Sequence, residues 1–233
     1  MLRRRFAVLV LSLILTTSGV LTSLQAQEDR HSEWEESIRD FERQDREQGF
    51  PAPGAVVFIG SSSIRGWVTL KDDMAPLHVI NRGFGGSQLD DATFFANRIV
   101  IPYFPSRVVL YSGDNDINSG KKPETLAADF RAFVERLRGS IPGLPVYFMS
   151  VKPSNARWKH WGNMQKANAL IRDYCNTDSL LFYVDVASVL LGADGKPDAA
   201  LFKEDGLHLN DAGYIKWTEV VKPLLSQPLP SGR

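Results

Sequence analysis

The chain has 233 residues, of which 43% are hydrophobic, with 27 Lys and Arg side chains and 27 Asp and Glu side chains. This length and apolar content are enough for one domain with a substantial core, and the balanced charge, without any basic tract, excludes the usual signature of a nucleic-acid-binding protein. The only cysteine is Cys175, which excludes an intrachain disulfide.

The first 26 residues are typical of a secretory signal peptide. Three arginines at 3–5 precede an apolar run at 6–15 and a stretch of small residues that ends at Ala26. The run is short for a membrane span, although an uncleaved N-terminal anchor is an alternative. Without 1–26, which holds three arginines and no acidic residue, the net charge is 24 − 27 = −3. We expect export to a bacterial periplasm or exterior, and no stable membrane insertion after cleavage.

Residues 27–233 are expected to form a single domain that begins with a helix. Residues 28–48 are highly charged and carry Trp34, Ile38 and Phe41 at helical spacing. This pattern predicts an amphipathic helix within 27–50, packed on the domain surface.

Short apolar runs then alternate with longer stretches of helical periodicity. Uninterrupted apolar runs suit strands that are buried on both faces, as in a parallel sheet. The alternation predicts an α/β fold, a three-layer α/β/α domain whose central parallel sheet has about five strands. The expected strands are 55–59, 78–81, 107–111, 146–150 and 181–184, and the expected helices are 123–139, 164–175 and 215–224.

Two of the loops that follow predicted strands are rich in glycine or serine. Ligands of parallel sheets bind beyond the carboxyl ends of the strands, so these loops should open on the binding edge. The first, Gly60-Ser61-Ser62-Ser63, could place a serine at a helix N-terminus, with a plain helix cap or a phosphate-cradling loop as alternatives. The second, 83–87, could present a backbone N–H to an anion, or is simply a tight turn.

A third loop, Gly113-Asp114-Asn115-Asp116, also follows a predicted strand. The Asn115 amide is a neutral donor suited to an oxyanion, with an Asx turn as the alternative. Asp114 and Asp116 could suggest a divalent metal, but the chain lacks an obvious further cluster of hard ligands. We therefore expect no metal and no organic cofactor.

A fourth loop, 205–210, precedes the last helix. Of the four histidines, only His208 has a carboxylate, Asp205, at a spacing where one short loop could aim both groups at one point. A carboxylate on one imidazole nitrogen leaves the other nitrogen free to accept a proton. The alternative is a surface turn with Asp205 as a turn residue or helix cap.

Taken together and in this order, the four loops resemble the SGNH (GDSL-type) hydrolase family, and they cover nearly the whole of residues 27–233. The resemblance implies a flavodoxin-like SGNH fold, with Ser62 as nucleophile, His208 as base and Asp205 as the acid that orients it. It also implies an oxyanion hole made by the backbone N–H groups of Ser62 and Gly86 and the side-chain amide of Asn115. The matching blocks are Phe58-Ile59-Gly60-Ser61-Ser62-Ser63-Ile64, Asn81-Arg82-Gly83-Phe84-Gly85-Gly86, Gly113-Asp114-Asn115-Asp116 and Asp205-Gly206-Leu207-His208.

One position departs from the family pattern. Ser61 stands where the family normally has Asp, which is not the acid of the triad. We expect the acyl-transfer groups to be intact and the hydrogen bonding around the nucleophile loop to be altered. Ser61 or Ser63 are alternatives as nucleophile, although the family register favours Ser62.

The function implied by the resemblance is that of a secreted serine esterase acting on short-chain acyl esters, in particular acetyl esters, on small molecules or carbohydrate. Trp158, His160 and Trp161 follow the fourth strand and could bind substrate, with the indoles stacking on sugar rings; packing of that loop is the alternative. Other readings are a lysophospholipase- or thioesterase-like acylhydrolase, a non-catalytic binding module on the same fold, or a phosphate-binding protein. The sequence does not indicate an oligomeric state.

Overall fold

The computed structural model describes residues 31–229 of the chain. The expected signal peptide, 1–26, lies outside the described residues. The chain divides into a unit that ends at Ser37 and a unit that begins at Ile38. The described part of the first unit holds a 3₁₀ turn, η1 (Ser32–Trp34), and the start of helix α2 (Glu35–Gln48). The predicted helix at 28–48 is thus present as α2, which ends just before Gly49, a residue with a φ of 91°.

The second unit is built on a five-stranded sheet in which every neighbouring pair of strands is parallel. The strand order is β2-β1-β3-β4-β5, the order of flavodoxin-like folds. Each predicted strand is present within a residue or two of its expected bounds. The strands are β1 (Val56–Gly60), β2 (Val79–Gly83), β3 (Arg107–Tyr111), β4 (Val146–Met149) and β5 (Leu181–Val184).

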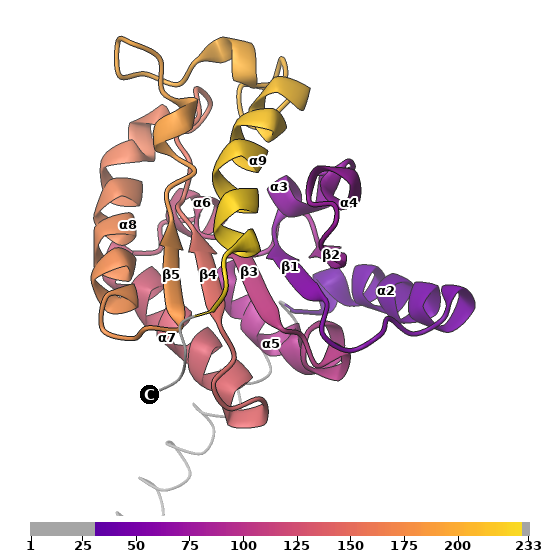
Figure 1. Ribbon diagram of the computed structural model, residues 1–233. Helices are drawn as coiled ribbons and strands as arrows, with labels where there is room; N and C mark the ends of the chain where they lie inside the picture. The colour runs from indigo at the N-terminus through magenta and orange to yellow at the C-terminus, as the bar shows by residue number, and fades with distance from the viewer. Residues whose placement is uncertain (1–30, 230–233) are drawn as a thin grey trace, which may run out of the picture. The chain divides into compact units, whose positions relative to one another are not determined.

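Helices cover both faces of the sheet, which confirms the predicted three-layer α/β/α architecture. In Figure 1 the yellow helix α9 lies in front of the sheet, and α5 and α7 lie behind it. Neighbouring helices of the rear layer are in contact, α5 with α7 and α7 with α8, and α4 contacts α9 in the front layer. The helices are α3 (Ser62–Arg65), α4 (Leu70–Asp73), α5 (Leu89–Ile99), α6 (Asp114–Asn118), α7 (Pro123–Ser140), α8 (Trp161–Cys175) and α9 (Asp211–Ser226).

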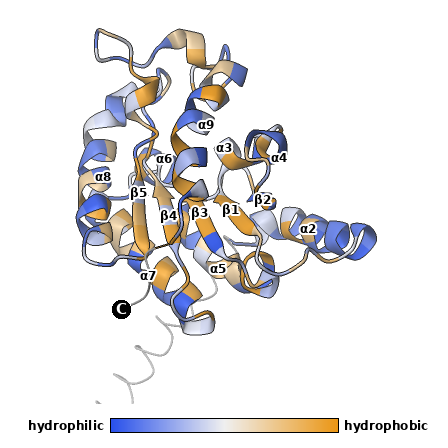
Figure 2. Ribbon diagram, viewed as in Figure 1, coloured by the Kyte–Doolittle hydropathy of each residue, from blue (hydrophilic) through white to orange (hydrophobic). Residues whose placement is uncertain are grey.

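The hydrophobic pattern explains these layers. The strands are largely apolar, apart from Asn81 and Arg82 of β2 and Arg107 of β3, whereas the helices carry both polar and apolar residues (Figure 2). All five residues of β1 are buried, as a strand covered on both faces requires. No helix within residues 31–229 has the length and hydropathy needed to span a membrane.

Among the described helices of more than five residues, α5 is the one that was not predicted. Helix α5 follows the glycine-rich loop after β2, and the Asp91 side chain accepts a hydrogen bond from the Gln88 backbone N–H at 2.8 Å, which caps its first turn. Leu89, Phe95 and Ile99 are buried on its inner side. This helix places the loop after β2 against the loop after β3, as described below.

Candidate active site

Ser62 lies at the carboxyl end of β1, where the chain turns from the strand into α3. Gly60 makes this turn with a φ of 147°, and a Cβ at this position would lie 1.9 Å from the Tyr111 carbonyl oxygen of β3. Only glycine fits there, because the conformation and the close approach of the neighbouring strand both exclude a side chain. Ser61 then donates its backbone N–H to the same carbonyl at 3.2 Å, and Ser62 becomes the first residue of α3.

The loop after β2 packs directly on the helix that carries Ser62. A Cβ on Gly83 would lie 2.1 Å from the backbone nitrogen of Arg65, so the last residue of β2 touches α3. The Asn81 side chain joins the same elements, because its amide donates to the Ile64 carbonyl at 2.7 Å. Gly86 follows with a φ of 83°.

The Asn115 side chain comes from the second residue of α6, after β3. Its amide donates one hydrogen bond to the Ser87 carbonyl at 2.9 Å. A primary amide has two N–H donors, so the second remains to bind a further acceptor. The glycine-rich loop and the Asn115 side chain are therefore in direct contact.

The loop before α9 brings Asp205 and His208 to Ser62. The Asp205 Oδ2 atom lies 2.6 Å from His208 Nδ1, and His208 Nε2 lies 2.9 Å from the Ser62 Oγ atom. The other Asp205 oxygen accepts the backbone N–H groups of Leu207 and His208, each at 2.9 Å. The hydrogen bond from His208, together with those two, holds the pKa of Asp205 well below its ordinary value. Asp205 is therefore an ionised acceptor, which requires His208 Nδ1 to carry a proton and leaves Nε2 free to accept one.

This loop is held in place on both sides. Asn210 caps α9 by accepting the Gly213 N–H at 3.1 Å, and its amide donates to the carbonyls of Ala200 and Phe202. Gly206, between the acid and the histidine, accepts a hydrogen bond from the Ala156 N–H at 3.1 Å. The imidazole is thus positioned by α9 and by the loop after β4.

The neighbouring serines differ from Ser62. Ser61 and Ser63 are both 1% exposed, and no hydrogen-bond partner of the Ser61 hydroxyl is found within the described residues. The structure thus pairs His208 with Ser62, the serine that the register of the family pattern favoured. Ser61 leaves a buried hydroxyl where the family pattern has a carboxylate.

The two aspartates that flank Asn115 do not share a site. Asp114 is buried and pairs with Lys152 at 3.3 Å and Arg157 at 3.2 Å. Burial alone would raise the pKa of Asp114, but the two positive charges lower it below its ordinary value. Asp116 points elsewhere and pairs with Lys121 at 2.8 Å. Asp114 and Asp116 therefore have separate partners, and within the described residues Asp114 does not belong to the carboxylate group that includes Asp116.

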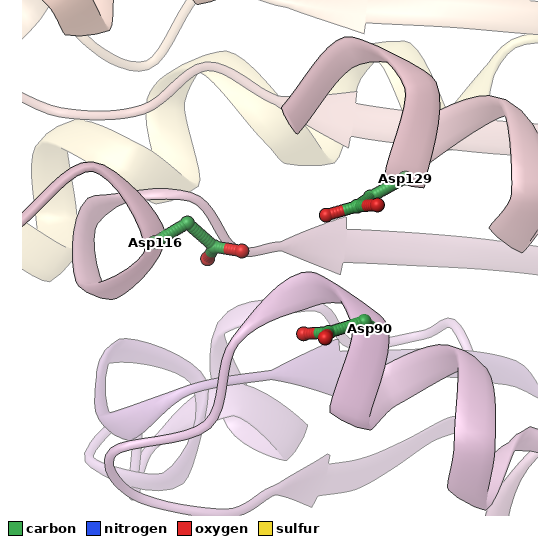
Figure 3. Close-up of side chains that lie close together, drawn as sticks. All are labelled: Asp90, Asp116 and Asp129. Atoms are coloured by element: carbon green, nitrogen blue, oxygen red, sulfur yellow. The ribbon is translucent and has the colours of Figure 1, made fainter. Parts of the chain in front are cut away.

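Sequence reasoning missed the cluster to which Asp116 belongs. The carboxylates of Asp90, Asp116 and Asp129 converge on one point (Figure 3), with ligand atoms within 4.8 Å of one another. These residues come from three different helices, so no sequence spacing predicts their meeting. The Lys121 ammonium contacts all three carboxylates, at distances from 2.7 to 3.3 Å. The cluster thus already contains a cation of the protein itself.

The three candidate substrate-binding residues lie in the segment after β4, but they do not line one cavity. The indoles of Trp158 and Trp161 are nearly parallel, at 17°, with centroids 6.1 Å apart. Trp161 lines a cavity of about 300 Å³ beside Asp185, at the carboxyl end of β5. His160 lines another, of about 390 Å³, beside Ile117 at the end of α6.

Comparison with known proteins is consistent with this arrangement. The model of the GDSL-like lipase/acylhydrolase family matches residues 48–215. No curated protein matches the chain. Among solved structures, a GDSL-like lipase from Bacteroides thetaiotaomicron is similar, with a TM-score of 0.69 and 21% identity, over 81% of this chain and 98% of that one.

Two esterases also share the fold. An acetyl-xylooligosaccharide esterase from Geobacillus has a TM-score of 0.61 and 15% identity, over 78% of this chain and 99% of that chain. A carbohydrate esterase of family 3 from Talaromyces cellulolyticus has a TM-score of 0.60 and 17% identity, over 74% and 96% of the two chains. At these identities the likeness shows a common fold.

Proposed function

The chain belongs to the GDSL-like lipase/acylhydrolase family, and from this we propose that it is a serine esterase that cleaves short-chain acyl esters through an acyl-enzyme. The observation that carries the proposal is the unbroken contact from Asp205 through His208 to Ser62. A nucleophile, a base within hydrogen-bond reach and a third group that orients the base are what acyl transfer at serine requires.

In the proposed mechanism, His208 Nε2 removes the Ser62 proton while Oγ attacks the acyl carbonyl. The imidazolium then gives that proton to the leaving alcohol, and the acyl group stays on Ser62. A water molecule then attacks the acyl carbon while His208 Nε2 removes its proton. The bond between the acyl carbon and Ser62 Oγ breaks, the imidazolium returns the proton to Oγ, and the acid is released. Asp205 stabilises the imidazolium through Nδ1 and remains ionised throughout.

The negative charge on the carbonyl oxygen needs donors that are already in place. We assign this role to the backbone N–H groups of Ser62 and Gly86 and to the second amide N–H of Asn115. Ser62 is the first residue of α3, so its N–H has no acceptor within that helix. Each such donor typically contributes ~3 kcal/mol of transition-state stabilisation.

For the substrate we propose an acetyl or similarly short acyl group on a polar carrier, in particular a carbohydrate. Support comes from the half-buried indoles of Trp158 and Trp161, whose outer faces offer a stacking surface for a sugar ring, and from the cavity beside Trp161. That cavity lies at the carboxyl end of β5. In the sheet β5 is three strands away from β1, the strand that leads to Ser62, and three strand spacings correspond to about 14 Å. It could therefore bind a remote part of an oligosaccharide. Two structural neighbours are described as esterases of carbohydrate substrates.

A lysophospholipase- or thioesterase-like acylhydrolase is the alternative within the family, and a non-catalytic binding module is the alternative outside it. We further propose that the protein is exported to the periplasm or the exterior, on the basis of the basic and apolar pattern of residues 1–26.

The test of the catalytic proposal compares two adjacent serines. Ser62→Ala should abolish turnover of p-nitrophenyl acetate and labelling by a serine-reactive fluorophosphonate, while circular dichroism remains that of the wild type. Ser61→Ala is the matched control and should retain activity, because its hydroxyl contacts neither His208 nor any other described polar group. Wild-type turnover by Ser62→Ala, or loss of labelling only in Ser61→Ala, would reject the assignment.

The substrate proposal has its own measurement. Rates on acetyl, butyryl and decanoyl esters and on acetylated xylan should favour the acetyl substrates. Trp161→Ala should reduce kcat/KM on acetylated xylo-oligosaccharides and leave p-nitrophenyl acetate unaffected. A preference for decanoyl esters would indicate the lipid-directed alternative.

A further inference from the structure

Lys121 makes an unusual set of contacts beside the proposed oxyanion site. It follows α6, and its ammonium lies 2.8 Å from Asp116 of α6, 2.7 Å from Asp129 of α7 and 3.3 Å from Asp90 of α5. Figure 3 shows these three carboxylates pointing toward one another from the three helices. One lysine therefore links three helices through charged contacts.

The Asp116 carboxylate also reaches the loop that carries Gly86. Its Oδ1 atom, which contacts Lys121, accepts the backbone N–H of Leu89 at 3.1 Å. Leu89 begins α5, three residues after Gly86. Next to Asp116, the Asn115 amide donates to the Ser87 carbonyl at 2.9 Å. Two hydrogen bonds thus join the segment 86–89 to the pair Asn115–Asp116.

The charge of Asp116 gives Lys121 a second effect. The Asp116 side chain is fully buried, and it directly follows Asn115 in the chain. A buried carboxylate without a countercharge is costly and would oppose negative charge developing near Asn115. Burial raises the pKa of Asp116, and Lys121 acts against this shift. The three carboxylates in turn raise the pKa of Lys121, although burial alone would lower it, so the ammonium stays charged.

We propose that Lys121 is a positioning residue for ester hydrolysis, which holds Asp116 so that the Gly86 N–H and the Asn115 amide converge on one oxyanion. The proposal rests on the function proposed above. It requires no contact between Lys121 and the substrate, since the lysine acts through Asp116 and Leu89. The consequence is a lower kcat, because donors that are displaced stabilise the transition state less, while ground-state binding changes little.

The test is Lys121→Met, which keeps the length of the side chain and removes its charge. The concentration of active sites is taken from the extent of fluorophosphonate labelling at completion. The kcat per labelled active site and the KM are then measured with p-nitrophenyl acetate. We expect kcat to fall about ten-fold with KM nearly unchanged. The dissociation constant of a small alkylboronic acid, whose adduct with serine mimics the tetrahedral oxyanion, should rise by a similar factor. A variant with a lower Tm but wild-type kcat per labelled site would overturn the proposal.

A second variant keeps the proposal testable if Lys121→Met folds poorly. Asp116→Asn has the same size and removes the charge from the other partner, and it should lower kcat with the same pattern. The double variant should lose no more than the larger single loss, because the pair acts as one unit. A double variant whose fold-loss of kcat equals the product of the two single fold-losses would contradict this expectation.

The control is Lys216→Met, which breaks an exposed ion pair with Glu219 at 3.0 Å on α9 and should leave kcat unchanged. The proposed function fails if the wild type neither turns over the ester nor is labelled at Ser62. This inference alone fails if the wild type does both and Lys121→Met matches it in kcat and boronic acid affinity.

Discussion

Asp205 combines exposure with a fixed orientation. Its side chain is 47% exposed, yet one oxygen accepts two backbone N–H groups and the other contacts His208 Nδ1. The short loop therefore supplies the rigidity that burial supplies to the acids of other triads. Its lowered pKa follows from these contacts, so the carboxylate stays ionised under mildly acidic conditions.

Asp205→Asn should lower kcat on p-nitrophenyl acetate by about 10²- to 10⁴-fold. The asparagine oxygen can still accept the two backbone N–H groups, which turns its NH₂ group toward His208 Nδ1. That nitrogen must then accept a hydrogen bond, so the proton moves to Nε2 and the base faces Ser62 in the wrong tautomer. Asp198→Asn is the control, since Asp198 makes a similar contact with the Ala200 N–H at 3.0 Å beside η5 (Ala199–Leu201). Equal kcat values in the two variants would contradict the role of Asp205.

At the scale of elements, the position of Ser62 depends on the turn between β1 and α3. Gly60 ends the strand, and the backbone of β3 lies where its side chain would be. The next residues then enter α3 at the edge of the sheet. A turn this tight aims the first residue of the helix away from the sheet and toward the loop before α9.

Gly60→Ala should destabilise the protein by about 3 kcal/mol or more, because the Cβ meets the Tyr111 carbonyl and the φ of 147° is strained for alanine. Urea unfolding measures the change. Gly139→Ala is the matched substitution in α7, where nothing lies within 4 Å of the new Cβ, and should stabilise the protein by about 0.5 kcal/mol. Similar effects of the two substitutions would show that the close approach of β3 is unimportant.

At the scale of the whole second unit, an aromatic cluster joins residues that are far apart in the sequence. Trp217 of α9 packs against Tyr111 of β3 at 4.9 Å and against Trp67, after α3, at 5.8 Å between ring centroids. Tyr214 of α9 donates a hydrogen bond to the Ser63 carbonyl at 2.9 Å. The cluster therefore holds α9 against α3. Because His208 precedes α9 and Ser62 begins α3, this packing brings together two residues that are 146 positions apart in the sequence.

Trp217→Ala should destabilise the protein by about 3–5 kcal/mol, because it leaves a large cavity where three elements meet. This is a large part of the ~5–15 kcal/mol that stabilises a typical domain, so esterase activity should be lost at a lower temperature. Thermal unfolding and residual activity measured together check this result. Ile215 lies on the same helix and is 57% exposed, so Ile215→Ala should change the free energy of unfolding by less than about 0.5 kcal/mol. A Tm for Trp217→Ala close to that of Ile215→Ala would argue against the cluster as the link.

Much of the fold was predictable because the signals are local. The run at 55–59 is apolar without interruption, since β1 is covered on both faces, and its composition alone indicated a buried parallel strand. Helix α5 was missed, because Leu89, Phe95 and Ile99 follow a glycine-rich loop and were not recognised as a helical stripe.

The sequence by itself determined the order of the five strands along the chain and the four blocks that carry Ser62, Gly86, Asn115 and the pair Asp205–His208. Only the tertiary structure decided that His208 Nε2 meets Ser62 rather than its neighbours, and that Asp114 and Asp116 have separate partners. The physical reason is that hydrophobic periodicity records which side of an element is buried, whereas contacts of Lys121 with three helices depend on how those elements pack. Such contacts join residues with no fixed spacing, so no local pattern predicts them.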